Sequence, residues 1–209
     1  MDTAELIKSF TGILSIVNPI GAIPVFIGLT SNWTDKQRNQ TADVAALATT
    51  IILLLAAFTG VYILKFFGIS LASFQVAGGI LLLLMAISML HAKLSRAKHT
   101  PIEAEEAEDM KSIAVVPIAI PLLAGPGSIS TVILYAHYSQ KIQDKILLSG
   151  TIILVGIIVW ITLRMAVPIG TKLGATGVNI AVRILGLILA AISVEFMAAG
   201  LKGLFPRLG

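Results

Sequence analysis

Residues 18–24 read Asn-Pro-Ile-Gly-Ala-Ile-Pro, and residues 121–128 read Pro-Leu-Leu-Ala-Gly-Pro-Gly-Ser. Each stretch interrupts a long apolar run with residues that oppose a regular helix: proline removes a backbone donor, and glycine permits torsion angles closed to other residues. Both stretches therefore predict a helix that breaks in its middle. In a bilayer the peptide groups freed by such a break must face protein, water or a solute, because facing lipid unpaired is costly.

The composition around these breaks excludes a water-soluble globule. The chain of 209 residues is 56% hydrophobic and only 12% charged, and its mean hydropathy is +0.95. It contains no cysteine, which excludes disulfides, a thiolate nucleophile and Cys-ligated metal sites. The net charge is +4, and the basic residues that produce it lie in short gaps between apolar runs. This pattern predicts orientation in a lipid bilayer and not binding to nucleic acid.

Six apolar segments are long enough to cross about 30 Å of hydrocarbon, and each is expected to be a transmembrane helix. They are residues 6–29, 44–64, 66–92, 112–140, 146–163 and 180–201. We therefore predict an all-α, multi-pass integral membrane protein. The connection at 91–112 carries nine charged residues and is expected to be a solvated cytoplasmic linker between a first unit at 1–90 and a second at 113–209.

The two units carry signs of an internal repeat. The break prolines Pro19 and Pro126 are 107 residues apart, and the similar segments 80–88 and 185–193 are 105 apart. Two matches at nearly one offset favour duplication. Because each unit holds three spans, an odd number, the second must enter the membrane in the opposite sense. The sequence thus predicts two inverted three-helix repeats, with the first and fourth helices broken at the Pro/Gly motifs.

The distribution of Lys and Arg predicts the orientation of these spans. Nine of these residues lie in the segments after the first, third and fifth spans, and six lie on the other side. Positive charge concentrates in cytoplasmic loops, so both termini are expected outside the cytoplasm.

Three polar residues lie in the spans away from the breaks. Gln75 would form an interhelical hydrogen bond or line a solute path, and Arg183 would snorkel to the surface. Glu195 lies deeper, which predicts either a structural partner on another span or a protonation site for proton coupling. Sodium coupling is the alternative if the substrate is held by carbonyls. No metal-ligand cluster occurs in the sequence, and no cofactor is expected.

The paired breaks are open to two interpretations. Half-helix ends that meet across a pseudo-two-fold axis would offer amides to a carboxylate and carbonyls to an ammonium group, which suits a small zwitterion. Alternatively, both breaks are simple kinks that neighbouring helices repair. A channel or facilitator, and a non-transporting assembly or regulatory protein, also stay open. An enzyme is not expected, because a nucleophilic Ser128 would need a general base at membrane depth, and no span offers a histidine or a pair of aspartates there.

The motifs also carry a resemblance to a known family. Asn-Pro-Ile-Gly at 18–21, Phe-Gln-Val-Ala-Gly-Gly at 74–79, Ala-Gly-Pro-Gly-Ser-Ile-Ser at 124–130 and Arg-Ile-Leu-Gly-Leu at 183–187 resemble the MarC family of bacterial and archaeal inner-membrane proteins. That family includes SnatA-type transporters of small neutral amino acids such as glycine and alanine. The resemblance implies an inner-membrane exporter of this substrate class. It also implies a substrate site formed by Asn18, Gly21, Gly125, Gly127 and Ser128, to which we add Gln75 as a candidate wall of the path.

Overall fold

The computed structural model describes residues 3–30, 33–91, 118–119, 122–139 and 141–206. Within these ranges the regular structure is entirely helical, as predicted. The α-helices in chain order are α1 (Thr3–Val17), α2 (Pro19–Leu29), α3 (Asp35–Phe66), α4 (Leu71–Leu90), α7 (Pro126–Tyr138), α8 (Ile142–Arg164) and α9 (Ala166–Leu204). The predicted linker, apart from His91, lies outside the described residues.

Five helical stretches of the described residues are long and apolar enough to cross a membrane. They are Ala4–Leu29, Asp35–Phe66, Leu71–Leu90, Ile142–Arg164 and Asn179–Leu204. These five correspond to five of the six predicted spans. The remaining predicted span, 112–140, contains the half-helix α7, but residues 112–117 lie outside the described ranges.

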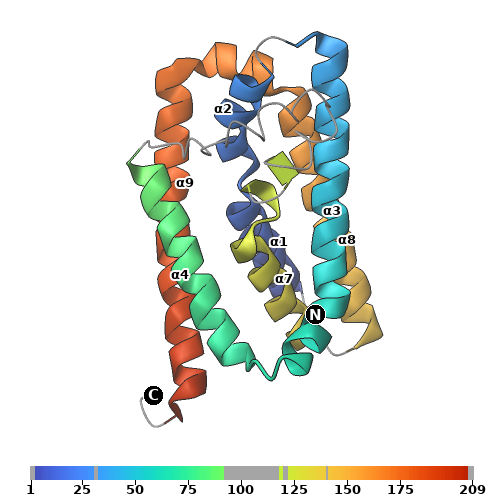
Figure 1. Cartoon of the computed structure of the whole chain (residues 1–209), viewed down its shortest axis with the longest axis vertical. Coiled ribbons are helices and arrows are strands. Elements are labelled where there is room, and N and C mark those ends of the chain that lie inside the picture. Colours follow the sequence, from blue (N-terminus) through green and yellow to red (C-terminus); the bar gives the residue numbers. More distant parts are fainter. Residues whose placement is uncertain (1–2, 31–32, 92–117, 120–121, 140, 207–209) are drawn as a thin grey trace.

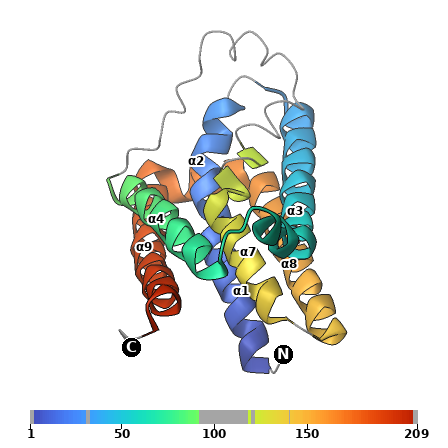
Figure 2. The same cartoon turned by 60° about the horizontal axis from the view of Figure 1, so that its bottom comes forward.

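The helices form three groups side by side. Helices α1, α2 and α7 lie in the middle, with α3 and α8 on one side and α4 and α9 on the other (Figures 1 and 2). The larger buried core lies where the middle group meets α3 and α8, around Ile23, Phe26 and Ile152. Burying these side chains removes apolar surface from contact with the surroundings and fixes α1, α2 and α7 against α3 and α8.

Glycines bring α4 and α9 into close contact along their length (Figure 1). A Cβ atom on Gly79 would lie 2.6 Å from Met197 Cγ, and one on Gly200 would lie 2.8 Å from the Ala72 carbonyl oxygen. Small residues at such contacts let helix backbones approach and gain van der Waals packing, which drives helix association in lipid. Helices α4 and α9 therefore behave as one closely packed pair.

Local sequence signals define the ends of α3. Thr34 and Gln37 form a capping box at its start, with the Gln37 side chain accepting from the Thr34 backbone N–H at 3.0 Å. At its end Gly68 adopts φ 66°, and the Ile69 N–H donates to the Leu64 carbonyl at 2.9 Å. This Schellman-type arrangement uses the freedom of glycine to turn the chain into α4.

The last helix begins earlier than the sequence predicted. The sixth span was expected at 180–201, but α9 starts at Ala166 and bends at Gly174, where φ is 64° and ψ is 171°. The part before the bend crosses one end of the bundle (Figure 1). The sequence did not predict the part before the bend, because this segment is short and contains Thr171 and Lys172. Such a segment cannot cross a bilayer and is expected to be a connection.

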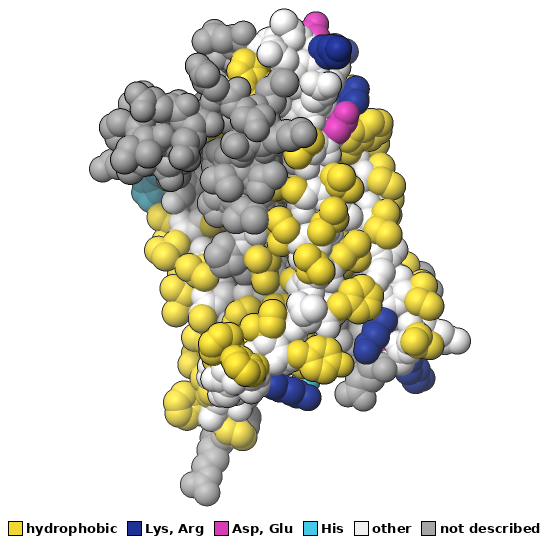
Figure 3. Space-filling view, turned by 45° about the vertical axis from the view of Figure 1, so that its right-hand side comes forward, with side chains coloured by type: hydrophobic (Ala, Val, Ile, Leu, Met, Phe, Trp, Pro, Cys, Tyr) yellow, Lys and Arg dark blue, Asp and Glu magenta, His cyan; other side chains and the backbone are white. Residues whose placement is uncertain are grey.

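Charged side chains gather near the two ends of the face drawn in Figure 3, and hydrophobic side chains cover the broad band between them. Many large apolar side chains in the spans are exposed, including Leu55, Ile153 and Leu187. An apolar band between charged ends is what a lipid-facing surface requires.

One charged cluster joins α3 to α8 in a way that the sequence analysis missed. The Arg164 guanidinium pairs with the Asp43 carboxylate at 2.8 Å, and Trp160 Nε1 donates to the same carboxylate at 2.7 Å. A signal was available, because Asp43 immediately precedes one apolar run and Arg164 immediately follows another. Helices α3 and α8 run in opposite directions (Figure 1), so the beginning of the first apolar run lies beside the end of the second.

The close contact of α4 and α9 gives a test of the fold. Gly200→Leu should lower the free energy of unfolding by about 1–3 kcal/mol, because the new side chain would enter space held by Ala72 and Val76. Gly150→Leu is the matched control, since no atom lies within 4 Å of its added Cβ. Thermal unfolding of both variants in detergent would measure the difference, and equal stability would contradict the packing.

Candidate substrate site at the paired helix breaks

The first predicted break lies at Asn18. Helix α1 ends at Val17, and Asn18 adopts the left-handed conformation with φ 49° and ψ 64°. It is the only non-glycine residue with positive φ in the described part of the chain. Asparagine tolerates this conformation better than other L residues because its short side chain bonds locally. Here its Oδ1 accepts from the Gly21 N–H at 3.1 Å and caps α2.

The Asn18 side chain also reaches α4. Its Nδ2 lies 3.5 Å from Met89 Sδ, and the residue is only 5% exposed. The amide therefore connects the break in the first span to a residue 71 positions further along the chain. Pro19, at the first helical position of α2, needs no hydrogen-bond acceptor, which lets α2 begin directly after the break.

The second break lies before α7. Residues 118–119 and 122–123 form short helical turns, and the Ala124 N–H donates to the Ala119 carbonyl at 2.8 Å. Gly125 is extended, with ψ at 174°, and provides no side-chain cap for α7. The Ser128 hydroxyl donates to the Leu123 carbonyl at 2.8 Å, which ties the preceding turn to α7. The first amides of α7 have no acceptor within their own helix.

The two breaks come together against one face of α4. A Cβ atom on Gly127 would lie 2.8 Å from Leu82 Cγ and 3.7 Å from Ile16 Cγ2, two residues before Asn18. Leu82 of α4 lies beside Gly127, and Met89 of the same helix lies beside Asn18. Their spacing of seven residues is two turns, or about 10 Å, along one helix face. The structure thus brings the predicted residues of both breaks to the middle of the bundle.

The breaks are closed in this conformation. A Cβ atom on Gly21 would meet the Asn18 side chain, and one on Gly127 would meet Leu82. Every buried side-chain nitrogen and oxygen among the described residues has a hydrogen-bond partner. A solute that entered between Gly127 and α4 would therefore have to displace Leu82.

The other three predicted residues lie away from the breaks. Gln75 is half-buried in the second turn of α4, and no hydrogen bond joins it to a described residue of either break. Arg183 and Glu195 are exposed on the outer face of α9. Neither has a hydrogen bond or ion pair to another described residue, so the partner expected for Glu195 is not found in this part of the chain.

The sequence analysis did not identify Leu82 and Met89 as neighbours of the breaks. Both lie in the Leu-rich third span, where nothing in the residue types separates them from side chains that face lipid. Their spacing of seven places them on one face, but only the contacts show that this face meets the breaks.

The described residues form an all-helical arrangement with five candidate spans and two helix breaks among them, which defines a multi-pass integral membrane protein. The chain belongs to the MarC family: the pattern described as MarC family integral membrane protein matches residues 3–205. This confirms the family indicated by the sequence motifs.

Relatives from distant organisms match nearly end to end. The UPF0056 membrane protein YhcE of Escherichia coli (strain K12) is 43% identical over 201 residues, which cover 96% of this chain and 94% of that protein. The UPF0056 membrane protein MJ1677 of Methanocaldococcus jannaschii is 41% identical over 203 residues, or 97% and 98% of the two chains. The UPF0056 membrane protein BU267 of Buchnera aphidicola is 39% identical over 207 residues, or 99% and 96%. No solved structure matches this chain.

The conformation of Asn18 can be tested by two substitutions. Asn18→Ala should lower the free energy of unfolding by about 2–3 kcal/mol, because it removes the cap of α2 and strains the left-handed backbone. Asn18→Gly removes the cap but accepts the backbone angles, so it should cost less than about 1 kcal/mol. Thermal unfolding in detergent would compare the stability of the two variants with that of the wild-type protein. Equal stability of the two variants would show that the backbone conformation carries no cost.

Proposed function

We propose that this protein is a secondary transporter that exports small neutral amino acids such as glycine and alanine across the inner membrane. The observation that carries the proposal is the pair of helix breaks, held together against α4 in the middle of the bundle. A break deep in a membrane protein needs a reason, because the freed peptide groups must be satisfied without lipid. Two matched breaks that face one helix provide a site for a polar solute.

The chemistry of the breaks suits a zwitterion. Helices α2 and α7 both begin at the breaks, and the amides at a helix start carry partial positive charge that attracts a carboxylate. Helix α1 ends there, and its last carbonyls attract an ammonium group. The residues at the breaks, among them Asn18, Gly125 and Ser128, carry no charge of their own. A substrate with one positive and one negative group therefore matches the site better than an ion.

The helix order supports the proposal of two inverted repeats, at 1–90 and 113–209. Each unit would contain a broken helix followed by two long ones: α1–α2, α3 and α4 in the first, and the segment that ends in α7, α8 and the bent helix α9 in the second. Helices α3 and α8 run in opposite directions, as do α4 and α9 (Figure 1). In this arrangement the segment with α7 supplies a sixth crossing.

Alternating access would come from motion of the α4–α9 pair. This pair is closely packed at Gly79 and Gly200, and it contacts the breaks through Leu82 and Met89. Tilting the pair as a unit would withdraw Leu82 from Gly127 and open the site toward one side. The larger core around α3 and α8 would stay in place, held in part by the Asp43–Arg164 pair. A proton or a sodium gradient would drive export, and imposing each in turn would distinguish them.

Transport in liposomes tests this proposal. Purified protein should catalyse saturable counterflow of labelled glycine and alanine. Ser128→Ala should raise the half-saturating concentration about five- to thirty-fold, because the hydroxyl positions the turn before α7. Ser9→Ala is the matched control, since Ser9 is also buried and donates to a backbone carbonyl, that of Leu6 in α1.

A cysteine at Ser128 gives a second measurement of the same site, because the chain has no native cysteine. Glycine should slow the reaction of Ser128→Cys with a thiol reagent and leave that of Ser9→Cys unchanged. Flux without saturation or counterflow would identify a channel, and no flux with no protection would identify a non-transporting protein.

The proposed orientation predicts where reporters are active. The start of α1 and the end of α9 lie toward the same end of the bundle (Figure 2). A reporter that works only in the periplasm should be active after Gly209, and one that works only in the cytoplasm should be active near His99. The opposite pattern would reverse the orientation and the direction assigned to transport.

A further inference from the structure

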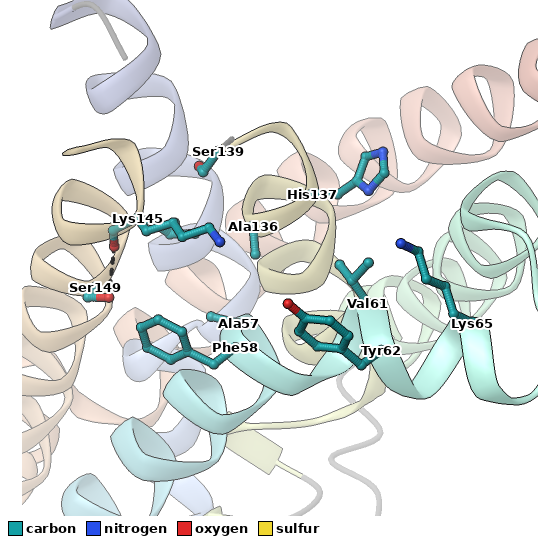
Figure 4. A pocket seen from close by; sticks show the side chains of 11 residues that line it. Ala57, Phe58, Val61, Tyr62, Lys65, Ala136, His137, Ser139, Lys145 and Ser149 are labelled. Atoms are coloured by element: carbon teal, nitrogen blue, oxygen red, sulfur yellow. Dashed lines mark hydrogen bonds between the residues drawn. The ribbon is translucent and has the colours of Figure 1, made fainter. Parts of the chain in front are cut away.

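A cavity of about 320 Å³ opens at the end of the bundle where α3 and α7 finish and α8 begins (Figure 4). It lies far along α7 from the break at Gly125, and its residues are not among those of the proposed transport site. The lining residues are Ala57, Phe58, Val61, Tyr62, Lys65, Ala136, His137, Ser139, Lys145, Leu148 and Ser149.

The rim of this cavity carries two positively charged side chains. Lys65 is next to last in α3, and Lys145 lies in the first turn of α8. The two side chains approach the cavity from opposite sides (Figure 4). Neither ammonium group has a hydrogen bond or ion pair with another described residue. No acidic residue is among the described residues that line the cavity. The rim therefore suits an anion.

Two of the hydroxyl groups that line the cavity already donate hydrogen bonds to backbone carbonyls, and a third does not. Ser139 donates to the Tyr135 carbonyl and Ser149 to the Lys145 carbonyl, each at 2.8 Å. The Tyr62 hydroxyl has no partner among the described residues and lies at the cavity (Figure 4). Among the hydroxyl groups that line the cavity, it is therefore the one that we expect to donate to a bound anion.

The cavity continues into an apolar surface along α3. Large apolar side chains on one face of this helix are exposed at intervals of three or four residues. They are Leu47, Ile51, Leu55, Phe58 and Tyr62. This stripe leads from the cavity along the part of α3 that crosses the membrane. The charged rim lies at the end of the apolar span, which is the depth of lipid headgroups, where aromatic side chains also concentrate.

We propose that this cavity binds the phosphate of an anionic phospholipid. Lys65 and Lys145 hold the phosphate from two sides, the Tyr62 hydroxyl donates to it, and an acyl chain lies along the α3 stripe. Basic pockets between transmembrane helices are a known way to hold such headgroups. A free phosphate ion would occupy the rim alone, whereas a phospholipid would also place an acyl chain on the apolar surface of α3 that faces the bilayer. The bound lipid would join the ends of α3 and α8.

The experiment is lipid retention, measured by native mass spectrometry of the full chain in detergent. Wild-type protein should retain phosphatidylglycerol in preference to phosphatidylcholine. In the double variant Lys65→Gln/Lys145→Gln, the ratio of retained phosphatidylglycerol to phosphatidylcholine should fall about 25-fold, because each lysine near a headgroup contributes about five-fold to binding. Lys172→Gln/Lys202→Gln is the matched control, since both lysines are exposed on α9 and do not line the cavity.

Two results would overturn the proposal. One is unchanged preference for phosphatidylglycerol in the Lys65→Gln/Lys145→Gln protein. The other is displacement of the lipid from wild-type protein by millimolar inorganic phosphate, which would assign the cavity to a free anion. The wild-type competition needs no variant, so the proposal is testable even if the double variant does not fold.

Discussion

The structure depends on the requirement that every backbone amide and carbonyl in the hydrocarbon layer finds a partner. An unbroken helix meets this requirement alone, but α1 and α2 are separated at Asn18 and α7 is preceded by a break at Gly125. At the first break Asn18 provides an acceptor for the Gly21 N–H and so caps α2. At the second break the Ser128 hydroxyl provides a donor for the Leu123 carbonyl. Such breaks are stable only when surrounded by protein, which explains why the broken helices occupy the middle of the bundle.

Helix α4 links this constraint to the proposed transport cycle. It contacts the first break through Met89 and the second through Leu82, while Gly79 packs closely against Met197 of α9. Close packing between α4 and α9 favours movement of the two helices together. The closed breaks seen here would be one state of that movement, and the open states would differ in the position of the pair.

The ends of the bundle have a different chemistry from its middle. At one end Asp43, Trp160 and Arg164 join α3 to α8 through a bidentate ion pair. At the other end Lys65 and Lys145 face a cavity between the same two helices, and we assign their neutralisation to a lipid. Helices α3 and α8 would thus be fastened at both ends, by protein charges at one and by a phosphate at the other. This is consistent with a stationary core beside a mobile α4–α9 pair.

How much the sequence could predict follows from how local each signal is. Proline, glycine and long apolar runs act on their own segment of chain, so the all-helical fold, five of the spans and the break at 18–24 were predictable. The short helix from Ala166 to the bend at Gly174 was not, because its residues lack the length and hydrophobicity of a span. The family was also recognisable, because its motifs are short local stretches of sequence, among them 18–21 and 124–130.

The tertiary structure alone decided which helix faces the breaks and which polar residues lie elsewhere. Leu82 and Met89 have the same residue types as side chains of α4 that face lipid. They differ only in their contacts with Gly127 and Asn18, and these contacts depend on how the helices pack. Glu195 was expected either to find a partner on another span or to serve as a protonation site, and only the structure shows that it is exposed on the outer face of α9. Helical periodicity specifies that residues share a face, but it does not specify the direction of that face, which depends on contacts between segments far apart in the chain.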